Sequence, residues 1–401
     1  MSANGVGSDA EFDPFNDAEE LRALTSALSS FHLYRRAAHQ NLTHHRRTSF
    51  FALSLAHQAL LNKSPINYLP TLDKVDHAIE DNAVLSEAIF RSAVDAFEID
   101  LGATGGGFKA WGNSASDGDL DKVRSTIKQF YRDWSDEGRV EREACYGGVM
   151  KELEERFGEV EDKYGSLNIY IRAIVLIPGA GLGRLAFDIA VAGYTSQGNE
   201  FSYHQLMASN YILNHTTAAN QHTLHPFIST FSNHPTRPSH LRGIQIPDVH
   251  PGSLLELMGS DRFSMTAGDF RQAYKDLHPS QKFDVCATVF FIDTAPNLIS
   301  YIETIKHLLV DDGVWVNFGP LLWHFEEHAQ EEQTSRNGGE GEDVGAAGKF
   351  ELCLDEVLAL VEMCGFKLEK VVTGAKTGYV GDEKSMLRHE YEGVFWVAVK
   401  A

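Results

Sequence analysis

The chain has 401 residues, of which 43% are hydrophobic and 10% aromatic, enough for one large core with an added subdomain or for two domains. Its 35 basic and 56 acidic residues give a formal net charge of −21. This charge opposes binding to nucleic-acid backbones and anionic membranes, although a local basic groove is compatible with a negative net charge. The acidic start lacks a signal peptide's apolar segment, and no run approaches the roughly 20 apolar residues that span a bilayer.

Cysteine and histidine spacing predicts neither a disulfide framework nor a metal site. The four cysteines, Cys145, Cys286, Cys353 and Cys364, have no C-x-x-C spacing, and the 18 histidines are scattered. We therefore expect a soluble protein of a reducing, intracellular compartment, with no bound metal.

The first part of the chain has a helical pattern. Residues 1–17 are small and acidic, which predicts disorder, and residues 18–165 form a predicted N-terminal helical region. Within this region, residues 73–98 form a long candidate amphipathic helix, and another helix is predicted to start near Asp119. Residues 136–157 continue the pattern.

From residue 166 to 401 strands and helices alternate. The predicted strands are 171–177, 194–199, 263–267, 283–291 and 313–318, followed by a closing antiparallel pair at 366–373 and 391–399. Predicted helices include 202–214 and 297–309. This pattern predicts an α/β fold with a Rossmann-like, doubly wound sheet. An acidic, low-complexity insertion at 331–349 is expected to be disordered.

The segment IVLIPGAGLGR (174–184) indicates a nucleoside-cofactor site. Its apolar start suits a buried parallel strand, its three glycines permit a tight turn beside a ligand, and a helix follows. Glu200 ends the next strand and can accept hydrogen bonds from two ribose hydroxyls. The dinucleotide pattern G-x-G-x-x-G needs a glycine where Arg184 stands, so the spacing favours S-adenosylmethionine (SAM) over a nicotinamide cofactor. A tight turn without a ligand is the structural alternative.

Polar residues follow other predicted strands, at the edge where such sheets bind ligands. Asp269 and Phe270 follow the third strand and could meet an adenine, Asp293 ends the most hydrophobic strand, and His324 follows the next. Asp293 has a structural alternative as the N-cap of helix 297–309, and His324 has one as a packed histidine.

Several long motifs together resemble the carnosine N-methyltransferase family, also called N2227-like proteins. They are STIKQFYRDWSDEG (125–138), REACY (142–146), IPGAGLGRLA (177–186), QGNEFS (197–202), FSMTAGDF (263–270), FFIDTAPN (290–297), NFGPLLWHFE (317–326) and EYEGVFW (390–396). The resemblance runs from about residue 18 to the C-terminus without the 331–349 insertion. It implies a class I methyltransferase fold with an N-terminal helical extension, and transfer of methyl from SAM to an imidazole nitrogen of carnosine, giving anserine.

The resemblance also implies roles for individual residues. The cofactor residues would be Gln129, Arg132, Gly179, Glu200, Asp269, Phe270 and Val289. The acceptor residues would be Asp293, His324, Tyr379 and Tyr391, the match around Tyr379 being short. Spacing alone would place Gln129 and Arg132 on a solvated helix face; the family match makes Arg132 the partner of the cofactor's carboxylate. Pro178 replaces the acid that many class I enzymes carry there, and the family shares this proline.

We therefore predict a SAM-dependent N-methyltransferase whose partner is a histidine-containing dipeptide. A protein-histidine or other small-molecule methyltransferase and a catalytically silent SAM-binding protein are the alternatives. A cytoplasmic protein is expected, and a nuclear pool and a homodimer stay open.

Overall fold

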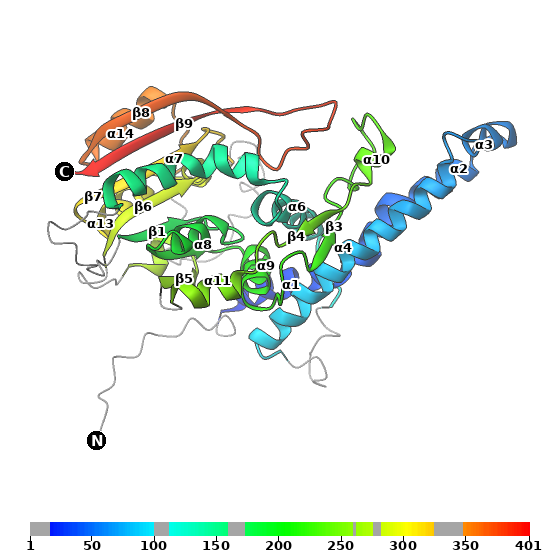
Figure 1. Cartoon of the computed structure of the whole chain (residues 1–401), viewed down its shortest axis with the longest axis horizontal. Coiled ribbons are helices and arrows are strands. Elements are labelled where there is room, and N and C mark those ends of the chain that lie inside the picture. Colours follow the sequence, from blue (N-terminus) through cyan, green and yellow to red (C-terminus); the bar gives the residue numbers. More distant parts are fainter. Residues whose placement is uncertain (1–16, 100–111, 159–172, 260–261, 276–281, 325–347) are drawn as a thin grey trace, which may run out of the picture. The chain divides into compact units, whose positions relative to one another are not determined.

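A computed structural model describes residues 17–99, 112–158, 173–259, 262–275, 282–324 and 348–401 (Figure 1). The chain forms two compact units, one of Met1–Ile127 with Ile228–Thr230 and one of Lys128–Phe227 with Phe231–Ala401. The division falls within helix α6 (Asp117–Trp134). Nearly all of the two segments expected to be disordered, and the expected boundary near residue 165, lie outside the described residues and stay predictions.

The first unit is helical, as its pattern predicts. Its described residues form α1 (Ala18–Ala38), a π-helical turn (His39–His44), α2 (His45–Phe51), α3 (Leu55–Leu61), α4 (Tyr68–Ala96) and the start of α6. The carboxylate of Asp17 caps α1 by accepting two backbone N–H bonds. Leu24 and Leu28 of α1 are fully buried, and the Ser86 hydroxyl of α4 donates to the Phe31 carbonyl of α1 at 2.8 Å. None of the described helices is long and apolar enough to cross a bilayer.

The second unit is built on a seven-stranded sheet, which confirms the predicted α/β class. The strands are β1 (Ile174–Pro178), β2 (Thr195–Glu200), β5 (Phe263–Ala267), β6 (Phe283–Val289), β7 (Leu309–Gly319), β8 (Phe366–Thr377) and β9 (Tyr391–Lys400). Their order is β5-β2-β1-β6-β7-β9-β8, and β9 pairs antiparallel with both β7 and β8 while the other pairs are parallel. The closing antiparallel pair is therefore present as predicted.

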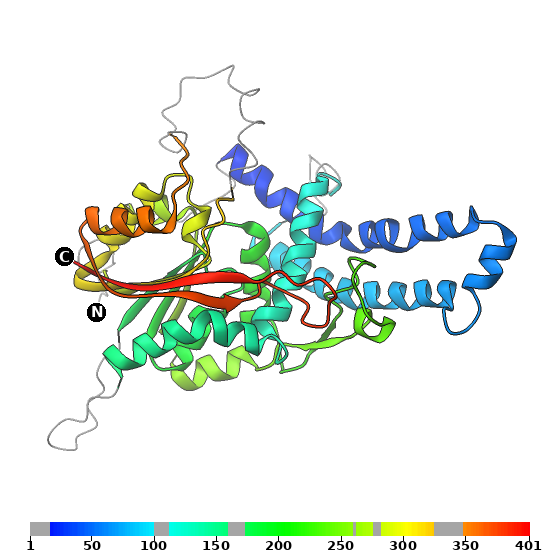
Figure 2. The same cartoon turned by 90° about the horizontal axis from the view of Figure 1, so that it is seen from above.

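Helices cover both faces of this sheet, because its central strands β1, β6 and β7 carry apolar side chains on both sides. On one face pack α7 (Arg139–Phe157) and α8 (Arg184–Val191); on the other pack α13 (Leu298–Leu308) and α14 (Leu354–Met363). Figure 2 shows α7 and α14 on opposite sides of the β8–β9 pair. Two tryptophans, Trp315 and Trp396, lie fully buried on the α13–α14 side.

Strand order fixes where a ligand can bind. From β1 the chain moves outward to β2 and β5, then returns to β6 on the other side of β1. The carboxyl ends of β1 and β6 thus flank the switch point of the sheet, where open α/β folds bind ligands. Sequence patterning misses the short β3 (His222–Leu224) and β4 (Ile244–Ile246), which pair only with each other, and the helices α10 (Arg237–His240) and α11 (Pro251–Met258). Helix α9 (Tyr203–Asn214) matches the prediction.

Candidate active site

The turn after β1 exposes its backbone to a ligand. Gly179, Gly181 and Gly183 have φ of 67°, 57° and 77°, a region that favours glycine. A Cβ at Gly179 would lie 2.6 Å from a Phe291 ring carbon, so a side chain cannot fit there. At Gly181 the nearest atom to a Cβ would be Gln205 Oε1, 3.9 Å away. Open space therefore remains beside Gly181.

Glu200, at the end of β2, faces this turn. Its Oε2 accepts the Gly181 N–H at 2.9 Å, and its Oε1 accepts the N–H groups of Phe201 and Ser202, each at 2.9 Å. Burial raises the pKa of Glu200, although the three N–H groups act to lower it. The side chain is thus fixed beside the open space, and a carboxylate keeps further lone pairs for hydroxyl donors.

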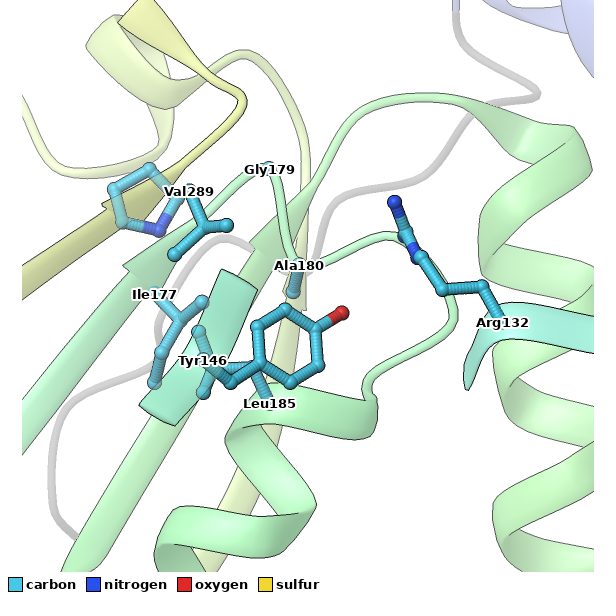
Figure 3. Close-up of a pocket in the computed structure, with 8 residues that line it drawn as sticks. Arg132, Tyr146, Ile177, Gly179, Ala180, Leu185 and Val289 are labelled. Atoms are coloured by element: carbon cyan, nitrogen blue, oxygen red, sulfur yellow. The ribbon is translucent and has the colours of Figure 1, made fainter. Parts of the chain in front are cut away.

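A pocket opens at the switch point. Its lining is Arg132, Tyr146, Ile177, Pro178, Gly179, Ala180, Leu185 and Val289 (Figure 3). In Figure 3 Ile177 and Val289 lie on neighbouring strands, and Arg132 lies across the turn that carries Gly179 and Ala180. Three of the predicted cofactor residues, from α6, the glycine turn and β6, are therefore brought to one pocket.

Arg132 enters the pocket as a cation that is already paired. Its Nε and Nη2 donate to the two carboxylate oxygens of Asp133 at 2.7 and 3.1 Å, and the Tyr146 hydroxyl donates to Asp133 at 3.0 Å. Burial alone would lower the pKa of Arg132, but Asp133 keeps it well above its ordinary value. The guanidinium stays charged with its remaining N–H groups available for an anionic ligand.

A buried ion network holds the end of α6 against the glycine turn. Arg184 donates to the Asp133 carbonyl at 2.8 Å and to Asp248 at 2.6 Å, and Arg142 donates to the same Asp248 at 2.9 Å. Arg142 also donates to the Arg132 carbonyl at 2.6 Å. Arg184, which argued against a dinucleotide, thus helps to position Arg132, a role that sequence reasoning misses.

Gln129 lies beside the turn through a partner that the sequence does not reveal. Its side-chain oxygen accepts a short hydrogen bond from Gln205 of α9, whose own Oε1 is buried without a hydrogen-bond partner among the described residues. That oxygen is the atom nearest to the open space at Gly181. An amine or hydroxyl donor of a ligand would satisfy it.

Asp269 and Phe270 occupy the turn after β5. Asp269 caps the short helix α12 (Phe270–Ala273) by accepting the Arg271 N–H at 2.9 Å. The Phe270 ring is 4% exposed and packs edge-on against Phe291, 5.6 Å between centroids. The ring is part of the core, so any contact of Phe270 with an adenine would come from its backbone.

Asp293 lies in the 3-10 turn Ile292–Thr294 that follows β6, and it is 1% exposed. Its Oδ2 accepts the Leu322 N–H at 3.1 Å, while Oδ1 has no hydrogen-bond partner among the described residues. Burial raises the pKa of this carboxyl to about 6, against the opposing effect of the Leu322 N–H and of His324. The alternative capping role is wrong, because Asn297 caps α13 by accepting the Ser300 N–H.

The other predicted acceptor residues gather near the ends of β6 and β7. The His324 N–H donates to the Asp293 carbonyl at 3.3 Å, and its side chain is exposed. The rings of Tyr379 and Tyr391 both contact Phe290, at 4.9 and 6.0 Å between centroids. Phe290 has φ of 51°, rare for a bulky residue, and sequence reasoning misses it because a short apolar run does not reveal backbone strain.

The site fits a single-nucleoside cofactor better than a dinucleotide. The open space at Gly181, the orphaned Gln205 oxygen and the charged Arg132 offer partners for ribose, amine and carboxylate groups. A pyrophosphate would need a glycine at position 184, where Arg184 is buried in ion pairs. No group of three or more His, Cys, Asp or Glu side chains in the described part of the chain is placed to hold a metal. The chain is therefore a class I methyltransferase that uses S-adenosylmethionine.

Comparisons with known proteins specify the family. The family model described as "Carnosine N-methyltransferase" matches residues 109–401. The "Carnosine N-methyltransferase" of Schizosaccharomyces pombe is 40% identical over 385 residues, covering 95% of this chain and 96% of the relative. The protein of the same name from Mus musculus is 36% identical over 414 residues, covering 100% of this chain and 93% of the relative. The chain belongs to the carnosine N-methyltransferase family.

Solved structures are more distant. A 1,6-didemethyltoxoflavin-N1-methyltransferase of Burkholderia thailandensis, solved with S-adenosylhomocysteine, is 15% identical with a TM-score of 0.35, covering 72% of this chain and 91% of the other. A magnesium protoporphyrin IX methyltransferase of Synechocystis is 10% identical with a TM-score of 0.33, covering 72% of this chain and 89% of the other.

Proposed function

We propose that this protein transfers a methyl group from S-adenosylmethionine to an imidazole nitrogen of carnosine, giving anserine. The observation that carries the proposal is the buried Asp293 carboxylate after β6, with one oxygen free of hydrogen bonds among the described residues. Membership of the carnosine N-methyltransferase family supports the choice of acceptor.

Asp293 suits the needs of an imidazole nucleophile. A neutral imidazole carries one N–H and one nitrogen with a free lone pair, whereas the imidazolium has no nucleophilic nitrogen. If the free Oδ1 accepts the N–H, the lone pair of the other nitrogen is directed away from Asp293, toward the cofactor. During transfer the ring gains positive charge, which a nearby carboxylate stabilises. The same carboxylate can then take the N–H proton and release it to solvent.

The cofactor residues divide by the part of the ligand they would hold. S-adenosylmethionine supplies an activated methyl group on a sulfonium centre. Glu200 would accept the ribose hydroxyls, and Arg132 would pair with the methionine carboxylate, with Gln129 beside it. The Gly179 turn and Val289 would contact the cofactor through backbone atoms, and the Asp269–Phe270 turn would receive the adenine.

His324, Tyr379 and Tyr391 are proposed to bind the dipeptide and hold its imidazole in plane. Two observations support these roles. Both tyrosine rings contact Phe290, and the backbone N–H of His324 donates to the Asp293 carbonyl. Orienting the ring this way makes attack on the methyl carbon unimolecular, which supplies much of an enzyme's rate.

The direct test is methyl transfer from labelled S-adenosylmethionine to a panel of acceptors. We expect label in carnosine, on an imidazole nitrogen, and less in free histidine. Failure of every histidine dipeptide to accept label would overturn the proposal. Label restricted to histidines of intact proteins would instead establish the rival function, a protein-histidine methyltransferase.

We also propose that the protein is a homodimer, located in the cytoplasm with a nuclear pool. Four free thiols support a reducing compartment, which both the cytoplasm and the nucleus are. Phe51, Leu55 and Leu60 on α2 and α3 are 61%, 83% and 60% exposed, which supports self-association. Light scattering on wild type and Leu55→Ser tests the dimer, and fractionation tests the location.

A further inference from the structure

The connection from β8 to β9 is fastened at the side of the active site. Two carboxylate oxygens of Glu141, in the first turn of α7, accept the N–H groups of Val380 at 2.6 Å and Gly381 at 3.3 Å. One helical turn further, Cys145 Sγ lies 3.2 Å from Thr377 Oγ1 at the end of β8. Helix α7 thus holds both sides of the Gly378–Gly381 turn.

The turn needs to be held. Val380 has φ of 54°, in the left-handed region where a β-branched residue is a genuine outlier. Such a conformation persists only where the surroundings impose it. The carboxylate of Glu141 supplies two charge-assisted hydrogen bonds to this turn, which are stronger than neutral ones.

Tyr379, which lies within the Gly378–Gly381 turn, reaches both halves of the proposed site. Its ring centroid is 4.9 Å from Arg132 Cζ, a cation–π contact, and 4.9 Å from the Phe290 ring. Arg132 lines the cofactor pocket, and Phe290 also contacts Tyr391. The Tyr379 side chain is 41% exposed, so packing encloses it only in part. Its position therefore depends on the backbone of the turn.

We propose that Glu141 is a positioning residue, which holds the Val380 turn in its unfavourable conformation and so keeps Tyr379 over Arg132 and beside the acceptor site. The part that concerns the acceptor rests on the proposed methylation of carnosine. The part that concerns Arg132 needs only the binding of S-adenosylmethionine.

The test compares Glu141→Ala with Glu143→Ala, an exposed carboxylate of the same helix whose ion pair with Arg139 spans 4.0 Å. Hydrogen exchange of the 378–386 segment measures how stably the turn is held. Calorimetry measures the affinity for S-adenosylmethionine, and steady-state kinetics measure the KM for carnosine. For Glu141→Ala we expect faster exchange in this segment, several-fold weaker cofactor binding, and a KM for carnosine raised about tenfold, with kcat less affected. Glu143→Ala should match wild type in all three.

A second pair of variants isolates the strain at position 380. Glycine adopts the left-handed region freely, so Val380→Gly should reduce the need for the carboxylate. The loss caused by Glu141→Ala should then be smaller in the Val380→Gly background than in wild type. If Glu141→Ala folds poorly, Glu141→Gln replaces it: one amide oxygen can accept one of the two bonds, and an intermediate defect is expected.

Two results would overturn the proposal. One is wild-type exchange, cofactor affinity and KM in both Glu141 variants. The other is an equal loss in the wild-type and Val380→Gly backgrounds, since Glu141 would then not act against the strain. A wild-type protein that leaves carnosine unmethylated would overturn the proposed function, while exchange and cofactor affinity would still decide the role of Glu141.

Discussion

Asp293 combines two properties that oppose each other in a folded protein: it is almost fully buried, and one of its oxygens has no hydrogen bond among the described residues. Leaving a buried polar atom unpaired costs stability. A site that must bind the N–H of an imidazole has a reason to keep such an atom. The sequence shows only that an acid follows a buried strand, and the structure removes the capping explanation through Asn297.

Replacing Asp293 by Asn should separate binding of the cofactor from turnover. The amide keeps a hydrogen-bonding oxygen but carries no charge to balance the ring. We expect kcat for carnosine to fall by about 10²–10³, with the affinity for S-adenosylmethionine nearly unchanged. Calorimetry and a methyl-transfer assay measure the two quantities, and Asp311→Asn, a fully exposed carboxylate on β7, is the control. Near-wild-type turnover by Asp293→Asn would contradict the proposed mechanism.

The same carboxyl sets a pH dependence. Catalysis needs an ionised Asp293, whose pKa is raised to about 6 by burial, and a neutral imidazole, whose unperturbed pKa is about 6.5. Both groups reach the required state as pH rises, so kcat/KM for carnosine should climb steeply between about pH 5.5 and 7 and level off above. In Asp293→Asn only the imidazole of the substrate still titrates, so the slope of log kcat/KM against pH on the acid side should halve. A wild-type profile with a single-proton slope would contradict this.

As pH rises, the contribution of Asp293 to the stability of the fold should change in the opposite direction to its contribution to activity. The folded-state pKa of about 6 lies above the unfolded value, so ionising Asp293 destabilises the fold, and this cost disappears as pH falls through about 6 toward 4. Asp293→Asn removes the cost. The ligand-free variant should therefore be more stable than wild type at pH 7.5, by up to about 3 kcal/mol, with no gain below pH 4. Urea unfolding at both values measures the difference; an Asn variant less stable at pH 7.5 would contradict the assignment.

At the scale of elements, the end of α6 is held to the glycine turn by charges that lie far apart in the chain. Asp248 accepts hydrogen bonds from both Arg142 and Arg184, and the Trp134 indole donates to the Leu182 carbonyl at 3.1 Å. This arrangement fixes Arg132 at the pocket although Arg132 and the turn belong to different elements.

Removing Asp248 should therefore affect both folding and cofactor binding. Asp248→Ala leaves two buried guanidinium groups without their shared carboxylate, which typically costs about 3–5 kcal/mol. We expect a clearly lower Tm and weaker binding of S-adenosylmethionine by the folded fraction. Asp311→Ala, whose carboxylate is fully exposed, should change stability by less than about 0.5 kcal/mol. Equal Tm values for the two variants would show that the network does not hold α6.

At the scale of the whole molecule, local sequence features predicted most of the fold. The predicted strands match the five parallel strands and the closing pair to within a few residues. Apolar runs mark β1, β6, β7 and β9, because burial on both faces demands such runs, whereas β2 and β5 are more polar. Short β3 and β4 pair over three residues, too few for a pattern to emerge. The glycine turn and Glu200 are local features and were predicted as a site.

Long-range partners could not be predicted in the same way. Asp248 lies 106 residues from Arg142 and 64 from Arg184, and no local pattern relates them. Gln205 and Phe290 owe their importance to neighbours from other elements and to backbone conformation. Position after a predicted strand nominated Asp269, Phe270, Asp293 and His324, and the motifs of the family resemblance supplied the remaining site residues. The roles of all these site residues stay predictions.

The contact between Cys145 and Thr377 has a consequence for redox chemistry. Burial raises the pKa of the Cys145 thiol to about 11, so at cellular pH almost none of it is thiolate, the form that oxidants and alkylating agents attack. This thiol beside the Tyr379 turn is thus chemically inert. Cys353, exposed at the start of α14, is the group that reagents meet first. Oxidative stress should therefore mark this protein at Cys353 while methyl transfer continues.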